Sequence, residues 1–302
     1  MEIKVWKFGG SFLKGSIMLS FREIIFKEAK NGNQILFVVS AIEGITRLLR
    51  LIFEAKTEKL NEDFKDLVVR LSLDEFRRIH VELILNLFSS EKAKKAKTDF
   101  LTTFHDLGDY INFYEKGDNE EAFYASVLKF GELASSGIFS SYLDCLGVSK
   151  LLFDARGYVV TSDSFKNAEI KSIDPLLEEL FLLKYECLVT QWFIGKNLKG
   201  EDTVLGFDGS DLSAAYLAGL LKDNGRNVSL TYWKNVSGFY KKDPSIYLNE
   251  EVFRYKMKFD EYALLPSHPI RLDAVRHAIE KGITVRMANF LVSNGIHAKI
   301  CP

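Results

Sequence analysis

One apolar segment, residues 34–40, constrains the fold of this chain more than any other feature. Its residues Gln-Ile-Leu-Phe-Val-Val-Ser follow a polar break at 31–33, and a helical pattern at 17–29 precedes that break. A strand that is apolar on both faces has to be covered on both faces, which is typical of parallel sheets. Together with the alternating strand pattern at residues 3–8, the segment predicts a βαβ unit.

Strand and helix patterns alternate along the rest of the chain as well. Helical periodicity with dense charge over residues 43–116 indicates an inserted helical layer. Further helices are expected at residues 120–145, 174–183, 212–221 and 272–281, and further strands at 150–154, 158–161, 186–190, 227–233 and 283–287. Strands that are separated by helices form mostly parallel sheets. The sequence thus predicts an α/β fold, in which a largely parallel central sheet lies between helices.

The charge balance and the cysteines exclude several classes of protein. The 40 basic and 41 acidic side chains give a net charge of −1, which excludes a protein that coats nucleic acid or binds membranes through a basic surface. No apolar run reaches the roughly 18 to 20 residues that span a bilayer. Cys145, Cys187 and Cys301 are odd in number and lack metal-ligand spacing, which argues against a disulfide framework or a zinc site. We expect a cytoplasmic protein with no nucleic-acid or membrane partner and no metal site of its own.

A glycine turn follows the first predicted strand. Lys7, Gly9, Gly10 and Ser11 place an ammonium group, two backbones without Cβ and a hydroxyl at the carboxyl edge of the sheet. Open α/β sheets bind ligands at this edge, and phosphate is the ligand that such a turn favours. The alternative is a tight turn with a surface lysine, and the spacing is not that of a Walker A loop.

A second glycine turn precedes the alanine-rich helix at residues 212–221. Gly209, Ser210 and Asp211 offer backbone N–H donors and a carboxylate at the helix N-terminus, although helix capping alone also explains them. Together the two turns would place Lys7, glycine backbones and Asp211 around one crevice. This combination suits phosphoryl transfer, which depends mostly on positioning and charge neutralisation.

Six sequence blocks stand in the same order as in the aspartate kinases of the amino acid kinase superfamily, and the chain resembles this family over almost its whole length. In this sequence the blocks lie at residues 7–11, 39–46, 130–136, 191–195, 205–215 and 232–244. They are similar to the family patterns K-F-G-G-T/S, V-S-A-x-x-G-x-T, G-E-x-x-S, P-G-F-I-G, L-G-R-G-G-S-D-Y-S-A-A and W-T-D-V-x-G-x-Y-x-x-D-P. Six ordered blocks indicate homology far more strongly than one glycine pair does.

The resemblance implies the amino acid kinase fold, a three-layer αβα sandwich. It predicts an N-terminal amino-acid-binding lobe at residues 1–198, which contains the helical insertion, and a C-terminal nucleotide-binding lobe at 199–302. Relatives commonly dimerise, so we expect a homodimer. Many relatives continue into regulatory ACT domains after the strand at 283–287, whereas this sequence ends soon after it, so we expect no ACT domain and no feedback inhibition through one.

The activity that the resemblance implies is transfer of the γ-phosphoryl group of ATP, with Mg²⁺, to the β-carboxylate of aspartate, the first step toward lysine, threonine and methionine. By the same resemblance Lys7 and Asp211 are catalytic, and Glu132 pairs with the ammonium group of the amino acid. The residues that would bind the acceptor are Ser40, Thr46, Glu132 and Phe207. Those that would bind ATP are Gly9, Gly10, Ser11, Ser210, Trp233, Lys234, Asn235, Tyr240, Asp243 and His268.

Two groups of substitutions depart from the family pattern. Phe207 replaces the arginine that grips the substrate α-carboxylate, and Asp208 replaces a glycine, so Arg47 is a candidate replacement cation. On the nucleotide side the changed positions are Asn235, Ser245 and His268. Two alternatives therefore stay open, namely an amino acid kinase with another carboxylate acceptor and a catalytically weak relative that binds nucleotide.

Overall fold

The computed structural model describes residues 2–59, 61–115, 117–191, 193–206, 209–240, 255–291 and 296–302. Its largest element is an eight-stranded sheet in the order β10-β12-β11-β9-β1-β2-β6-β3. The strands are β1 (Glu2–Phe8), β2 (Gln34–Val39), β3 (Lys150–Phe153), β6 (Cys187–Gln191), β9 (Asn227–Lys234), β10 (Lys256–Lys258), β11 (Val285–Asn289) and β12 (Ile296–Cys301). The pairs described in this sheet are parallel except that of β12 with β11. The predicted parallel sheet and its first βαβ unit are confirmed.

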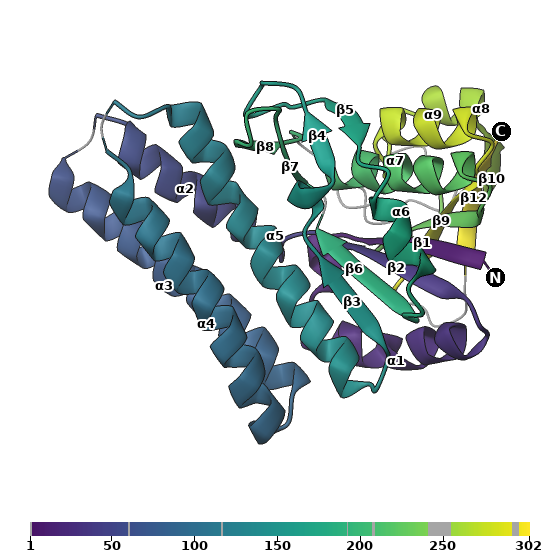
Figure 1. The fold of residues 1–302 in the computed structure, drawn as a ribbon, viewed down its shortest axis with the longest axis horizontal. Coiled ribbons are helices and arrows are strands. Elements are labelled where there is room, and N and C mark those ends of the chain that lie inside the picture. The colour runs from purple at the N-terminus through teal and green to yellow at the C-terminus, as the bar shows by residue number, and fades with distance from the viewer. Residues whose placement is uncertain are drawn as a thin grey trace.

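Helices cover both faces of this sheet (Figure 1). On one face lie α1 (Gly15–Lys30), α2 (Ile45–Thr57), α3 (Glu62–Leu87), α4 (Ser90–Phe113) and α5 (Glu120–Cys145). On the other lie α6 (Leu177–Leu182), α7 (Gly209–Asp223), α8 (Phe259–Ala263) and α9 (Leu272–Glu280). The expected three-layer sandwich is therefore confirmed. Helices α2, α3 and α4 fill the predicted insertion at residues 43–116.

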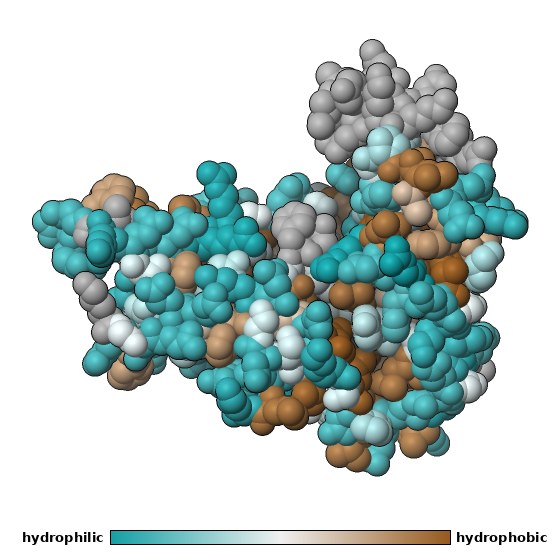
Figure 2. Space-filling model, turned by 90° about the horizontal axis from the view of Figure 1, so that it is seen from above, coloured by the Kyte–Doolittle hydropathy of each residue, from teal (hydrophilic) through white to brown (hydrophobic). Residues whose placement is uncertain are grey.

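The helical insertion extends from one side of the sheet, and its surface in Figure 2 is mainly hydrophilic. This matches the dense charge of its sequence. Within the part of the chain that the structure describes, no helix combines the length and the apolar character that crossing a bilayer requires.

The period-two alternation of β1 decides which side chains reach which helical layer. Trp6 and Phe8 pack among the helices α1 and α5, where Trp6 makes edge contacts with neighbouring aromatic rings. Ile3 and Val5 pack on the opposite face, against the layer that contains α7. Lys7 shares the parity of Ile3 and Val5, so the fold directs its side chain toward α7.

A second, four-stranded sheet was not predicted. It runs in the order β5-β4-β7-β8 and consists of β4 (Val159–Thr161), β5 (Ile170–Ile173), β7 (Ile194–Lys196) and β8 (Asp202–Val204). The prediction of one sheet was thus incomplete, and the strand expected at 158–161 belongs to this second sheet. Strands of three or four residues are too short to give a periodic signal in the sequence. Asp202 of β8 pairs with Lys129 of α5, which ties the small sheet to that helix, and also with Arg156, which precedes β4.

The predicted lobe boundary at residues 198 and 199 falls between β7 and β8, which pair with each other in the small sheet. The large sheet also takes strands from both sides of this boundary, since β1 lies between β2 and β9. The division into an amino-acid lobe and a nucleotide lobe stays a prediction.

His80 is the most deeply buried histidine that the structure describes. Its ring lies on α3 between Phe76 and Phe100, with centroid distances of 4.3 and 4.9 Å. Nδ1 is 2.7 Å from the carbonyl oxygen of Phe76 and donates to it, whereas Nε2 has no hydrogen-bond partner among the described residues. Burial lowers the pKa of His80 to about 4 from an ordinary value of 6.5.

The neutral state of His80 predicts a stability that depends on pH. Between about pH 6.5 and pH 4 the unfolded chain binds a proton on this side chain and the folded chain does not, so the free energy of unfolding decreases as the pH falls. We expect the contribution of His80 to the free energy of unfolding to decrease by about 2 to 3 kcal/mol from pH 7 to pH 4.5. Urea unfolding at both pH values should therefore show a smaller pH difference for His80→Leu than for the wild type. The exposed His105, changed to Gln, serves as the control, and equal pH differences in all three proteins would contradict the assignment.

Candidate active site

The carboxyl edge of the large sheet brings three predicted charged residues together. Lys7 lies at the end of β1, Lys234 at the end of the adjacent strand β9, and Asp211 in the first turn of α7. The Nζ atom of Lys7 is 2.6 Å from Oδ1 of Asp211, and Nζ of Lys234 is 3.0 Å from Oδ2. Both lysines therefore hold one carboxylate, and we call these three residues the charge cluster.

The charge cluster is almost completely removed from water. The side chains of Lys7, Lys234 and Asp211 are 5, 19 and 1 % exposed. Burial alone would raise the pKa of Asp211, but the charges of Lys234 and Lys7 and their hydrogen bonds outweigh it and lower the pKa to about 2. Two cations and one anion leave a net positive charge, which favours an anionic ligand at the mouth of the cluster.

Hydrogen bonds hold the start of α7 against the sheet. The hydroxyl of Tyr232, on β9, donates to the carbonyl oxygen of Asp211 at 2.8 Å. The hydroxyl of Ser40, which follows β2, donates to Oγ of Ser210 at 2.9 Å. The second glycine turn is therefore connected to two different strands, and this connection is more than helix capping.

The first glycine turn has one crowded and one open glycine. A Cβ on Gly10 would lie 2.4 Å from the carbonyl oxygen of Ala41 and 2.7 Å from the backbone nitrogen of Glu43. A Cβ on Gly9 would meet only Nζ of Lys7, at 3.9 Å. Gly10 thus allows the turn to pack against the loop after β2, while Gly9 leaves open space beside the lysine.

Helix α5 carries Glu132, the acidic residue that is predicted to pair with the ammonium group of the amino acid. Glu132 is 4 % exposed, and its Oε2 accepts a hydrogen bond from the backbone N–H of Phe193 at 2.9 Å. Gly131 lies against Ile45 and Leu49 of α2, where an added Cβ would be only 3.0 and 3.2 Å away. This close approach places the carboxylate of Glu132 and the predicted Thr46 of α2 around the same space.

A cavity of about 610 Å³ lies at this edge. The predicted residues that line it are Lys7, Gly9, Gly10, Ser11, Ser40, Thr46, Glu132, Ser210, Trp233 and Lys234. Arg47, the candidate replacement cation, lines it too. Both glycine turns thus line the same cavity as Ser40, Thr46 and Glu132, three of the four predicted acceptor residues.

Other predicted nucleotide residues do not line this cavity. Asn235 is exposed and Tyr240 is half-buried. A ring nitrogen of His268, Nε2, lies 3.0 Å from the carbonyl oxygen of Tyr262. Trp233 does line the cavity, but it is only 4 % exposed and makes a T-shaped contact with Phe21 at a centroid distance of 4.4 Å, so its ring packs in the aromatic core. Phe207, Asp208, Asp243 and Ser245 lie outside the described residues.

The sequence interpretation missed Arg50 and Phe193, which also line the cavity. Arg50 follows Thr46 by four residues on α2, a spacing that places both on one face of a helix. This spacing was visible in the sequence. Nothing in the sequence indicated that Phe193 lines the cavity. Its contact with the site is a hydrogen bond from its backbone N–H to Glu132, which depends on how the chain folds.

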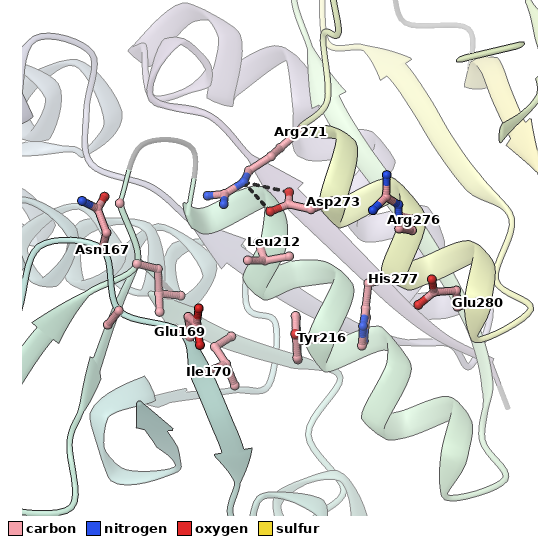
Figure 3. A pocket seen from close by; sticks show the side chains of 13 residues that line it. Asn167, Glu169, Ile170, Leu212, Tyr216, Arg271, Asp273, Arg276, His277 and Glu280 are labelled. Carbon is pink, nitrogen blue, oxygen red and sulfur yellow. Dashed lines mark hydrogen bonds and ion pairs between the residues drawn. The ribbon is translucent and has the colours of Figure 1, made fainter. Parts of the chain in front are cut away.

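A second cavity, of about 700 Å³, lies between the small sheet and the helices α7 and α9 (Figure 3). Tyr216 and His277 stack in it with ring centroids 4.0 Å apart, and Arg271 pairs with Asp273 at 2.7 Å. None of the predicted site residues lines this cavity. One link between this cavity and the charge cluster is Arg271, whose backbone N–H lies 3.4 Å from Oδ2 of Asp211.

The sequence profile of the amino acid kinase family matches residues 2–289 of this chain. The chain belongs to the amino acid kinase family. Among curated relatives of this chain, lysine-sensitive aspartokinase 3 of Escherichia coli (strain K12) is 30 % identical over 250 residues, which cover 81 % of this chain and 51 % of the relative. Bifunctional aspartokinase/homoserine dehydrogenase 2 of the same organism is 28 % identical over 241 residues, which cover 79 % of this chain and 28 % of the relative.

The fold of this amino acid kinase matches a crystal structure of Escherichia coli aspartokinase III in complex with aspartate and ADP. The TM-score is 0.80 at 24 % identity, and the match covers 99 % of this chain and 64 % of the other. The chain thus spans about half the length of aspartokinase 3 and less of the bifunctional relative.

The contrast between the two glycines of the kinase predicts different effects of the same substitution. Gly10→Ala forces a Cβ into backbone atoms, so we expect it to lower the free energy of unfolding by about 1 to 3 kcal/mol. Gly9 has extended backbone angles and open space where a Cβ would lie. Gly9→Ala should therefore change the free energy of unfolding by less than about 0.5 kcal/mol. Denaturant unfolding of both variants checks this, and equal losses would refute the packing role of Gly10.

The pairing in the charge cluster predicts that removal of the Asp211 carboxylate strongly destabilises the folded protein. Asp211→Asn removes the carboxylate that pairs with both largely buried ammonium groups, so we expect a loss of about 3 to 5 kcal/mol in the free energy of unfolding. The control is Asp223→Asn, which breaks a solvent-exposed pair with Lys281 and should cost less than about 1 kcal/mol. Thermal or urea unfolding at pH 7 measures both, and a cost for Asp211→Asn as small as the control's would argue against a stabilising cluster.

Proposed function

We propose that this chain is an aspartate kinase, which transfers the γ-phosphoryl group of ATP to the β-carboxylate of aspartate. The observation that carries the proposal is the buried charge cluster beside a glycine turn, in a cavity that also contains the carboxylate of Glu132. A net positive cluster suits a phosphoryl group, and a buried carboxylate suits the ammonium group of an amino acid. The likeness to lysine-sensitive aspartokinase 3 supports aspartate as the acceptor.

The proposed reaction needs little covalent chemistry from the protein. An oxygen of the β-carboxylate, already ionised at neutral pH, forms a bond to the γ-phosphorus as the bond to the bridging oxygen of ADP breaks. The products are an acyl phosphate and ADP. Lys7 and Lys234 would neutralise the phosphoryl oxygens, and Asp211 would keep both lysines in place. The open side of Gly9 would accommodate the triphosphate, as the sequence predicted.

Glu132, Ser40 and Thr46 would bind the acceptor. The carboxylate of Glu132 would pair with the ammonium group, and the two hydroxyls would orient the amino acid toward the charge cluster. For Phe207, Asn235, Tyr240, Asp243 and His268 the roles stay predictions from the resemblance. A homodimer is likewise proposed from the resemblance, and a cytoplasmic location from the three widely spaced cysteines.

We propose that Mg²⁺ enters this site with the nucleotide. Among the described residues no three histidine, cysteine, aspartate or glutamate side chains are grouped so that they could hold a metal ion, and both oxygens of Asp211 are paired with lysines. Mg²⁺ commonly keeps several waters and binds through substrate phosphates and one or two carboxylates. When bound, the ion would neutralise phosphate charge, and Asp211 is the carboxylate nearest to that role.

Trapping of the acyl phosphate as a hydroxamate tests the proposal. The full chain with Mg-ATP, aspartate and hydroxylamine should give hydroxamate, and Lys7→Ala should reduce the rate at least about 100-fold because it removes a cation from the transferred group. Lys94→Ala, which removes an exposed cation from α4, is the control. The melting temperature of each variant shows whether it is folded.

Three outcomes would count against the proposal. Hydroxamate from glutamate and none from aspartate would indicate another carboxylate acceptor. ATP binding without turnover of any acceptor would indicate a weak relative that only binds nucleotide. An unchanged rate in Lys7→Ala would remove the charge cluster from the mechanism.

A further inference from the structure

Helix α2 directs two arginines into the cavity of the charge cluster. Arg47 and Arg50 both line it, and neither forms an ion pair with a carboxylate among the described residues. The Nε atom of Arg50 is buried and has no hydrogen-bond partner in the part of the chain that the structure describes. A buried donor without a partner is unfavourable, so this guanidinium is placed for a ligand that the protein itself does not supply.

The position of Arg50 follows from the packing of α2. Leu49 and Ile52 are buried in the core, while Thr46 and Arg50, four residues apart, share the helix face that borders the cavity. Gly131 keeps α2 close to α5, so the face that carries Arg50 borders the same cavity as Glu132. The backbone of Arg50 is therefore held by a rigid helix between two others.

The other charges of the cavity already have partners. Lys7 and Lys234 are paired with Asp211, and Glu43 is paired with Lys14 at 3.1 Å on the exposed rim. Glu132 accepts a hydrogen bond from the backbone N–H of Phe193. The charge that a ligand has to complement beside α2 is therefore positive, and a planar guanidinium is matched best by a carboxylate.

We propose that Arg50, supported by Arg47, binds the carboxylate of the acceptor that is not phosphorylated. This inference rests on the proposed function and adds the residue that binds the second carboxylate of the acceptor. Glu132 then holds the ammonium group and Arg50 the α-carboxylate, so the side-chain carboxylate is left to face the charge cluster. Arg50 is a specificity-determining residue, and it acts from α2 rather than from the turn before α7.

Two acceptors that differ in one group test the inference. Aspartate carries the α-carboxylate, whereas 3-aminopropanoate has the same ammonium and reacting carboxylate without it. Arg50→Met should raise KM for aspartate roughly 10- to 100-fold, because a charge-assisted contact is lost, and leave KM for 3-aminopropanoate nearly unchanged. The preference for aspartate should therefore collapse, with a smaller change in kcat.

Two further variants serve as controls. Arg50→Lys keeps the charge and loses the planar fork, so we expect it to recover part of the preference for aspartate. Arg70→Met removes an exposed arginine from α3 and should change nothing. If Arg50→Met does not fold, the intermediate preference of Arg50→Lys carries the test. Unchanged KM and unchanged preference in the folded Arg50 variants would overturn the inference.

Binding without nucleotide separates failure of this inference from failure of the proposed function. Calorimetry should show that aspartate binds the wild type and binds Arg50→Met at least about 10-fold more weakly. If the wild type makes no acyl phosphate, the proposed function fails, and a loss of aspartate binding in Arg50→Met still supports the role of Arg50. Equal aspartate binding by both proteins, or no binding by the wild type, would overturn the role of Arg50.

Discussion

The ion cluster of Lys7, Asp211 and Lys234 is the constraint on which the rest of the site depends. A buried carboxylate and buried ammonium groups are tolerated only when they are paired, so the two strands and α7 have to meet at these atoms. A shift of β1 or β9 by one residue would turn its lysine to the opposite face of the sheet. The charge cluster therefore couples the register of the central sheet to the position of the first turn of α7.

The helical insertion contributes side chains to the lining of the cavity as well as packing against α1 and α5. Its first helix, α2, supplies Thr46, Arg47 and Arg50 to the cavity, and the contact at Gly131 brings α5 with Glu132 beside them. The sheet edge supplies the cations for a phosphoryl group, and the helical layer supplies the groups that suit an amino acid. The two halves of the proposed reaction are thus built by two structural layers that meet at one edge.

Long elements with strong patterns were predictable from the sequence, and short ones were not. The helix predicted at residues 120–145 matches α5, and the apolar run at 34–40 matches β2, because each has a long periodic or fully apolar pattern. The strands of the small sheet have three or four residues, and the pairing of β4 with β7 that joins its two halves links residues far apart in the sequence. The local sequence pattern therefore did not predict the small sheet, although it did predict a strand at the position of β4.

The sequence by itself determined the identity of the turns and the groups that they carry, since glycine, lysine and aspartate in those positions are local properties. Only the tertiary structure decided which of those groups meet. Strand β9 lies beside β1, so Lys234 joins Lys7 on one carboxylate, while the alternation of side chains turns the neighbouring Trp233 into the aromatic core. Likewise, the approach of α2 to α5 makes Arg50 part of the site. Such distances depend on strand order and helix packing, which a spacing in the sequence does not contain.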